Sequence, residues 1–474
     1  MYSYICVMDG KIILRKRLLN LSIPIFIESL LIILLGTMDT IMLSRFSDSS
    51  VASVGVVNQV FNMIIVVFQV SMLGTSVLCS QYLGAGNNEK VRLVAWLSLF
   101  FNFFLGIIIS TFLFFESELV LRWMRLDPSL MDEGVKYFRI VGGLAFIQSL
   151  SITISAILRS VSLAKYPMMV TGVINILNCF GNYVLIFGNF GMPALGAEGA
   201  AIATGISRII ALVILAIIVY KKVLPSFPKN FFTIPSFNEL KTMLRIGMPA
   251  AGESMSYSLS QVVVTMFINM IAVEVVATRT YVMNVVMFTY MFALAISMGN
   301  SILVGQLIGE QRKEDAYKIC LFSQYLSLGV TTLIAGFMAG FGTMILGLLT
   351  DNPDIIKLGA IILCIDFILE FGRSVNMMMV NALRSTGDAV FPVVLGLFSM
   401  WGFAVGVSWI LGINMGYGLI GMWCAFALDE CFRAVILLKR WKSKKWMKRN
   451  IISYDNPPIN PSVNHDEEPH LSLS

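Results

Sequence analysis

The sequence contains little charge and almost no histidine. Only 13% of its 474 residues are Asp, Glu, Lys or Arg, whereas soluble domains carry about 25%. Its mean hydropathy is +0.81 and 57% of its residues are hydrophobic. The two histidines, His465 and His470, lie in the polar C-terminal stretch, so proton or metal chemistry in the apolar part would have to use carboxylates. This composition predicts a membrane protein.

Motifs for metal clusters, disulfides and nucleotides are also missing. The seven cysteines are scattered through apolar stretches with no CxxC pair, which indicates buried small side chains. The stretch GAGNNEK (84–90) lacks the GK[ST] ending of a phosphate loop. Without a phosphate loop, we do not expect ATP to be the energy source. Because no loop carries a clustered set of catalytic residues, we do not expect an enzyme. The net charge of +6 is explained by membrane topology and does not suggest nucleic acid.

Twelve apolar segments are long enough to cross a bilayer as helices, which takes roughly 20 residues each. A polar, proline-bearing stretch at 221–241 separates the sixth segment from the seventh, and the chain from Asn450 has the composition of a disordered tail. The segments lie at about 21–44, 51–80, 92–115, 135–158, 167–187, 194–220, 246–270, 277–307, 318–349, 357–382, 390–412 and 417–438. The sequence therefore predicts an all-α membrane protein.

Lysine and arginine are concentrated at both ends of the chain and in the even-numbered loops. The odd-numbered loops hold little more than Arg45, Arg122, Arg125 and Lys357. Basic loops stay in the cytoplasm, so we expect a multi-pass protein of the plasma membrane with both termini cytoplasmic. The C-terminal cluster KRWKSKKWMKR (439–449) fits this orientation, and binding of anionic lipid is a second interpretation.

An internal repeat relates the two halves at an offset of 225 residues without a gap. Pro24 falls on Pro249, Glu28 on Glu253, and the LRS at 158–160 on the LRS at 383–385. Each half holds six helices, an even number, so both should enter the membrane in the same orientation and be related by a pseudo-two-fold axis along the membrane normal. This predicts two six-helix bundles, with domains at 1–220 (N-lobe), 221–244 (cytoplasmic linker), 245–445 (C-lobe) and 446–474 (polar tail).

The stretch LLGTMDTIML (34–43) places a carboxylate, Asp39, in an apolar helix, where even low estimates of the cost are about 2.5–3.5 kcal/mol. No basic residue lies three or four positions away, and its repeat counterpart is Val264, so the scaffold does not require an acid. Asn178 and Asn182, one turn apart on the fifth helix, could both face it and give a cation uncharged oxygen ligands. We interpret Asp39 as a cation-coupling residue for H⁺ or Na⁺; the alternative is a structural hydrogen-bond hub.

Other acids within the apolar segments have two interpretations each. Glu28 and Glu253 lie one turn after a helix-kinking proline, where they either satisfy backbone groups freed by the kink or line a cavity. Asp366, Glu370 and Arg373 lie on one helix face and form either a self-neutralising network or, with Glu253, a C-lobe proton or substrate site. The repeated pair Arg208 and Arg433, with Asp429 one turn before the latter, is interpreted as structural.

The motifs resemble those of the multidrug and toxic compound extrusion (MATE) family over about residues 15–445. They are MDTIM, whose Asp39 lies fifteen residues after Pro24, the loops QYLGAGNNEK and GQLIGEQRKEDA, LRSVSLAKYPM and LRSTGDAVFP, and LIFGNFGMPALGAEGAAIAT at 185–204. The resemblance implies twelve helices in two bundles and export of organic cations in exchange for H⁺ or Na⁺.

Two positions depart from the family pattern. Many relatives have Asn-x-x-x-Asp in helix 5, where this chain has Asn178 and Asn182. Some sodium-coupled relatives have a Glu and an Asp where this chain has Tyr257 and Arg373, so their C-lobe cation site does not carry over intact. The expected cavity residues are Glu28, Glu253, Tyr257, Asp366, Glu370 and Arg373.

We therefore predict a secondary antiporter that works by alternating access, with H⁺ or Na⁺ as the coupling ion and no other cofactor. Its partners would be small cationic or amphipathic substrates and the bilayer, and we expect a monomer. The alternative is a lipid-linked oligosaccharide flippase of the same wider superfamily, which should line its cavity with Arg and Lys. Intramembrane acids outnumber deep bases in the sequence, which favours cations.

Overall fold

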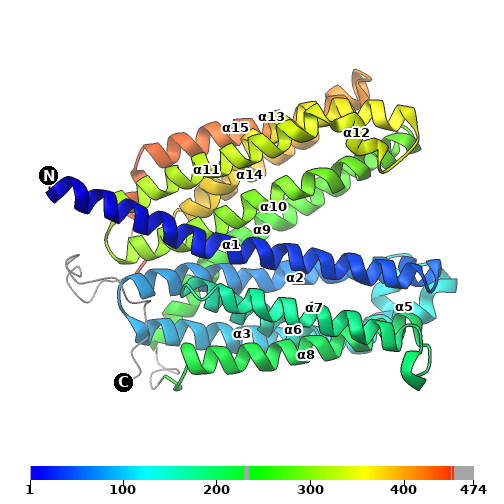
Figure 1. Cartoon of the computed structure of the whole chain (residues 1–474), viewed down its shortest axis with the longest axis horizontal. Helices are drawn as coiled ribbons and strands as arrows, with labels where there is room; N and C mark the ends of the chain where they lie inside the picture. Colours follow the sequence, from blue (N-terminus) through cyan, green and yellow to red (C-terminus); the bar gives the residue numbers. More distant parts are fainter. Residues whose placement is uncertain (1, 229–233, 450, 453–474) are drawn as a thin grey trace. The chain divides into compact units, whose positions relative to one another are not determined.

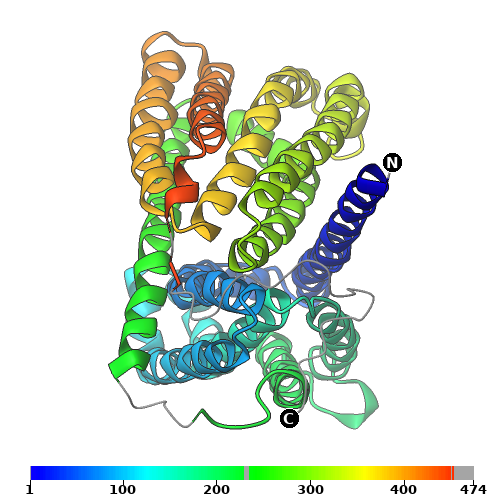
Figure 2. The same ribbon diagram turned by 90° about the vertical axis from the view of Figure 1, so that its left-hand side faces the viewer.

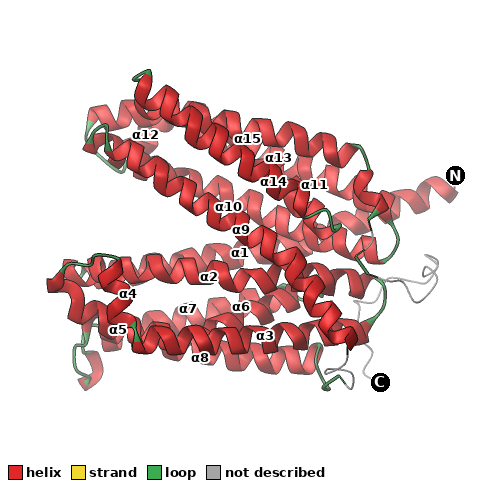
Figure 3. Cartoon of the chain, turned by 180° about the vertical axis from the view of Figure 1, so that it is seen from behind, coloured by secondary structure: helices red, strands yellow, loops and turns green. Residues whose placement is uncertain are grey.

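The computed structural model describes residues 2–228, 234–449 and 451–452. Within these ranges the chain forms helices and no strand, as Figure 3 shows. The prediction of an all-α membrane fold is confirmed, and each predicted apolar segment is helical. The stretch from Asn450 that was expected to be disordered lies mostly outside the described residues. Just before it, Lys445–Lys448 form a short helix (η5) whose Trp446 is fully buried.

Figure 1 labels the long helices, which run roughly alongside one another within each half of the chain. The first half contains α1 (Tyr2–Ser44), α2 (Asp48–Gly84), α3 (Asn88–Phe115), α4 (Ser117–Trp123), η1 (Pro128–Leu130), α5 (Met131–Gly143), α6 (Ala145–Ser160), α7 (Lys165–Leu185), η2 (Asn189–Gly191) and α8 (Gly196–Lys222). The second half contains α9 (Ile234–Asn269), α10 (Val273–Gly309), α11 (Lys313–Gly340), α12 (Gly342–Gly347), α13 (Pro353–Ser385), α14 (Val390–Ser399), η3 (Met400–Val407), η4 (Trp409–Asn414) and α15 (Gly418–Lys442).

Eight described helices are long and apolar enough to cross a membrane. The count is nine if Pro128–Gly143 and Ala145–Ser160, which meet at a bend of 44°, are taken together as one span. The long helices α9, α13 and α15 do not meet the test. Both α13 and α15 carry three charged residues within two turns, Asp366, Glu370 and Arg373 on the former and Asp429, Glu430 and Arg433 on the latter.

The two halves repeat their backbone conformation as well as their sequence. Three pairs of residues in the left-handed region are each separated by 225 positions: Gly86 and Gln311, Ser162 and Gly387, Gly191 and Gly416. These residues end or connect equivalent helices, so the turns of the second half are those of the first.

The described chain divides into two units whose boundaries fall inside α1 and α9, next to Pro24 and Pro249. The N-unit contains residues 27–248, and the C-unit contains the chain up to Phe26 and from Pro249. The 225-residue repeat predicts that the whole first helix belongs to the N-lobe (1–220). In the structure its first part packs in the C-unit, where the Arg17 Nη2 donates to the Gln306 Oε1 at 2.9 Å.

The first part of α1 packs in the C-unit and the first part of α9 packs in the N-unit, and each is held there by a close helix crossing. A Cβ at Gly247 of α9 would lie 1.6 Å from the Val70 carbonyl oxygen of α2, so only glycine fits there. The equivalent crossing in the C-unit joins α1 to α10, where a Cβ at Gly299 would lie 2.3 Å from the Ser22 Oγ. Figure 2 shows the same helices from the left-hand side of Figure 1. The C-unit core centres on Trp423 and the N-unit core on Phe68 and Phe138.

Candidate functional site

The structure brings Asp39 of α1 together with both asparagines of α7. The Asn182 Nδ2 donates to the Asp39 Oδ1 at 2.6 Å and to the Asn178 Oδ1 at 3.0 Å. The Asn178 Nδ2 in turn donates to the Thr204 Oγ1 of α8 at 3.2 Å. Sequence reasoning had not included Thr204, because a threonine in an apolar helix gives no signal of its own.

This N-unit site contains a buried oxygen atom that accepts no hydrogen bond. Asn178 and Asn182 are buried, with exposures of 1% and 0%, while Asp39 is half-buried. The Asn182 Oδ1 is buried and has no hydrogen-bond partner, although a buried amide oxygen normally has one. The site therefore combines one carboxylate with amide and hydroxyl oxygens, which are the ligand types that hard cations prefer.

Arg208 of α8 lies near this site without pairing with it. Its guanidinium stacks over the ring of Phe61 at 4.9 Å, and its buried Nη1 has no hydrogen-bond partner. It attracts the Asp39 carboxylate electrostatically, but no ion pair joins the two in the described chain. Asp39 therefore stays available to a mobile cation.

Glu28 and Glu253 form equivalent ion pairs in the two units. The Arg159 Nη1 contacts both carboxylate oxygens of Glu28 at 2.9 Å, and the Arg384 Nη2 contacts the Glu253 Oε2 at 2.7 Å. All four side chains are largely buried, with exposures of 6% to 14%. Neither interpretation from the sequence included these arginines, although both belong to the repeated LRS motif that could have suggested them.

The charged face of α13 meets a second charged face on α15. Arg373 forms an ion pair with Glu370 and lies 4.0 Å from the Glu430 Oε1. The Asp366 Oδ1 accepts a hydrogen bond from the Trp423 Nε1 at 3.1 Å. Of the two acids on its own helix, Arg373 therefore contacts Glu370 directly, while Asp366 is bonded to an indole.

The network continues along α15. The Arg433 Nη2 contacts the Asp429 Oδ2 at 2.6 Å and the Glu430 Oε1 at 3.0 Å, so Glu430 lies between two guanidinium groups. Glu430 also accepts a hydrogen bond from the Asn376 Nδ2 at 2.7 Å. The sequence analysis had not included Glu430, although the spacing Asp429, Glu430, Arg433 places all three on one helix face.

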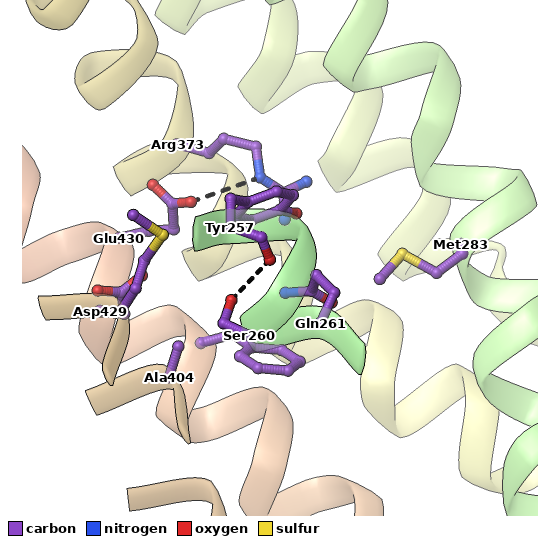
Figure 4. Close-up of a pocket in the computed structure, with 10 residues that line it drawn as sticks. Tyr257, Ser260, Gln261, Met283, Arg373, Ala404, Asp429 and Glu430 are labelled. Atoms are coloured by element: carbon purple, nitrogen blue, oxygen red, sulfur yellow. Dashed lines mark hydrogen bonds and ion pairs between the residues drawn. The ribbon is translucent and has the colours of Figure 1, made fainter. Parts of the chain in front are cut away.

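A small pocket of about 20 Å³ lies inside the C-unit beside this network, and Figure 4 shows its lining. It has room for about one water molecule and is far smaller than an organic substrate. Tyr257 and Arg373 are the predicted cavity residues that line it, together with Gln261, Asp429 and Glu430. Glu253, Asp366 and Glu370 do not line this pocket, and Glu28 belongs to the N-unit.

The chain matches a known family and several named relatives. The MatE family model matches residues 24–184 and 249–410. The uncharacterized transporter YisQ of Bacillus subtilis is 41% identical over 435 residues, which cover 92% of this chain and 95% of YisQ. The probable multidrug resistance protein NorM of Thermotoga maritima is 30% identical over 93% of this chain and 95% of its own length.

Solved structures show the same fold. A variant of the Vibrio cholerae MATE transporter VcmN superimposes with a TM-score of 0.85 at 19% identity, covering 92% of this chain and 98% of that one. The family match and the relatives named as transporters show that the chain is a multi-pass membrane transporter and not an enzyme. It belongs to the MATE family.

Proposed function

We propose that the protein is a secondary active antiporter that exports organic cations in exchange for H⁺ or Na⁺. The observation that supports this best is Asp39, a half-buried carboxylate that accepts a hydrogen bond from Asn182 and has no ion-pair partner among the described residues. A carboxylate held this way in an apolar helix is a functional site by default. The name of the Thermotoga maritima relative, a probable multidrug resistance protein, supports drugs as substrates.

The coupling would work by competition at Asp39. An ion bound by Asp39, Asn178 and Asn182 neutralises the site, and a cationic substrate is attracted when the ion leaves. A ligand shifts the balance between two conformations only by its differential affinity for them, so exchange at this carboxylate could drive the alternation between inward-open and outward-open states. We infer a monomer in the plasma membrane whose only other partner is the bilayer, with no nucleic acid.

A lipid-linked oligosaccharide flippase is the second candidate, and two arginines favour it. Arg208 and Arg279 pair with no carboxylate in the described chain; Arg279 instead donates to the Thr265 Oγ1 at 2.5 Å and the Gln261 Oε1 at 3.0 Å. Since Glu28 and Glu253 are neutralised by arginines, the excess of acids counted in the sequence overstates the negative charge open to a substrate. The unpaired Asp39 still favours the antiporter.

Ethidium efflux from everted membrane vesicles tests this function, with a pH gradient and a Na⁺ gradient imposed separately. The wild type should pump in response to at least one gradient. Asp39→Asn should insert and fold, since an amide is nearly isosteric and cheaper to bury, yet lose gradient-driven efflux. Asp48→Asn, the same change at an exposed position at the start of α2, is the matched control and should pump normally. Undiminished pumping by Asp39→Asn would show that Asp39 is structural.

A further inference from the structure

A row of lysines follows the end of α15 into η5. Lys439, Lys442, Lys445 and Lys448 recur at every third position, and all four side chains are exposed. Within the described ranges no carboxylate pairs with any of them. Their repeat counterparts in α8 and just after it are apolar, Ile214, Ile217, Tyr220 and Val223, so the repeated scaffold does not require lysine at these positions.

The other basic residues of this segment are neutralised within the C-unit. The Arg440 Nε and the Arg449 Nη2 contact the two oxygens of Asp388 at 2.9 and 3.3 Å. The Lys444 Nζ contacts the Glu314 Oε1 at 2.7 Å. The nearby carboxylates, Asp388 and Glu314, are therefore paired with residues that hold the segment in place. The four lysines of the row have no carboxylate partner among the described residues.

The row is fixed on a rigid support. Trp446 is fully buried and stacks on Trp441 at 4.3 Å, with 14° between the rings, and its Nε1 donates to the Trp441 carbonyl at 3.1 Å. The Lys313 Nζ donates to the Met447 carbonyl at 2.7 Å. In a 3₁₀ turn, side chains three residues apart eclipse one another, so Lys445 and Lys448 project from the same side. Folding has already ordered this segment, so a ligand does not bear that entropy cost.

We propose that the lysine row (Lys439, Lys442, Lys445, Lys448) binds the headgroups of anionic phospholipids. The row begins in the last turn of α15 in a multi-pass membrane protein, and the carboxylates beside it are already paired with other basic residues, so lipid headgroups are the source of negative charge left to it. Clustered lysines next to a membrane helix are attracted to anionic lipid, and four exposed lysines within ten residues of chain can contact several headgroups at once. The lipid would hold the end of α15, the helix that carries Asp429, Glu430 and Arg433, at the membrane surface.

The test uses the purified full-length protein in nonionic detergent, titrated with phosphatidylglycerol or phosphatidylcholine. Bound lipid is counted by native mass spectrometry, and the apparent melting temperature is followed in parallel. Phosphatidylglycerol should bind and raise the melting temperature of the wild type, and phosphatidylcholine should not. Replacing the four lysines with glutamine should weaken phosphatidylglycerol binding by about fivefold per lysine at low salt, and added salt should reduce the wild-type effect.

Two matched variants show whether lipid binding depends on the position of the lysines, on the net charge of the protein or on its folding. Lys221→Gln, Lys222→Gln, Lys241→Gln and Arg245→Gln together remove the same charge elsewhere on the exposed surface and should retain the lipid effect. Arginine at all four row positions keeps the charge and should also retain it.

Four results would overturn the proposal. The first is an equal effect of phosphatidylglycerol and phosphatidylcholine on the wild type, and the second is an equal loss of lipid binding in the row variant and the charge-matched variant. The third is loss of lipid binding in the arginine variant. The fourth is an equal rise in melting temperature with inorganic phosphate, which would indicate a general anion patch. Binding of polyglutamate without any effect of phosphatidylglycerol would likewise replace the lipid with an acidic protein partner.

Discussion

Single residues at equivalent repeat positions have opposite surroundings in the two units. Arg433 is paired with Asp429 and Glu430, whereas the corresponding positions around Arg208 are threonine and glycine. In the N-unit the carboxylate comes from α1 instead, as Asp39, and it stays unpaired. The N-unit therefore holds an acid with no ion-pair partner among the described residues, while Glu430 of the C-unit lies between two guanidinium groups. This asymmetry is the physical reason to place ion coupling in the N-unit.

Asn182 gives a prediction at this scale because α7 offers a matched control. Asn175 and Asn182 both donate an amide to α1 at 2.6 Å, the former to the Leu31 carbonyl and the latter to the Asp39 carboxylate. A hydrogen bond to a charged group contributes about 1.5–3 kcal/mol. Asn182→Leu should therefore slow gradient-driven efflux by at least about tenfold, and Asn175→Leu should lower the melting temperature while leaving the response to the gradients unchanged. Equal effects of both variants on efflux would remove Asn182 from the coupling site.

Arg373 gives a second prediction, on the stability of the C-unit. Removing one partner of a buried ion pair costs about 3–5 kcal/mol, so Arg373→Ala should lower the free energy of unfolding by this order. Glu370→Gln in the same background should recover part of the loss, because Glu370 is the direct partner. Asp366→Asn should recover less, since Asp366 bonds to Trp423. Unfolding of the two double mutants in detergent measures both couplings, and equal recovery would restore the three-residue unit expected from the sequence.

Helices α1 and α9 are each divided by a kink proline between two units. After each proline, an ion pair ties the helix to its own unit, Glu28 to Arg159 of α6 and Glu253 to Arg384 of α13. Before each proline, the helix packs in the other unit. Each helix therefore passes from one unit to the other near a proline, Pro24 or Pro249, where it lacks a backbone hydrogen bond.

The crossing of α9 over α2 can be tested on α9 itself, which carries two glycines in different environments. A Cβ at Gly247 would meet the Val70 carbonyl, a backbone atom that cannot move aside, whereas nothing lies within 4 Å of a Cβ at Gly252. Overpacking a tight contact costs about 1–3 kcal/mol. Gly247→Ala should therefore lower the melting temperature and the folded yield, and Gly252→Ala should not. A neutral Gly247→Ala would mean that the helices separate more easily at this crossing than the structure shows.

For the whole molecule, the sequence predicted what periodicity and composition encode. The apolar segments, the 225-residue repeat and the placing of Asn178 and Asn182 on one helix face follow from spacing. The contact of Asn182 with Asp39 was only one possibility, because spacing does not say which helices meet. The exchange of helix parts between units does not, because a repeat identifies equivalent positions without saying which unit they pack in. The ion pairs of Glu28 and Glu253 were missed for a similar reason, since their arginine partners lie 131 residues away and no helical period connects them.

The orientation of the whole chain gives the last prediction. Basic residues concentrate in the even-numbered loops, and the free energy of moving them across the membrane keeps such loops in the cytoplasm. Ser226 lies just after Lys221 and Lys222 and is exposed, and Glu274 is exposed at the start of α10 in an odd-numbered loop. In a background without the seven native cysteines, Ser226→Cys should react with a membrane-impermeant maleimide only after the cells are permeabilised, and Glu274→Cys should react in intact cells. The reverse pattern would invert the molecule, and Asp39 would then have to accept its coupling ion from the opposite side of the membrane.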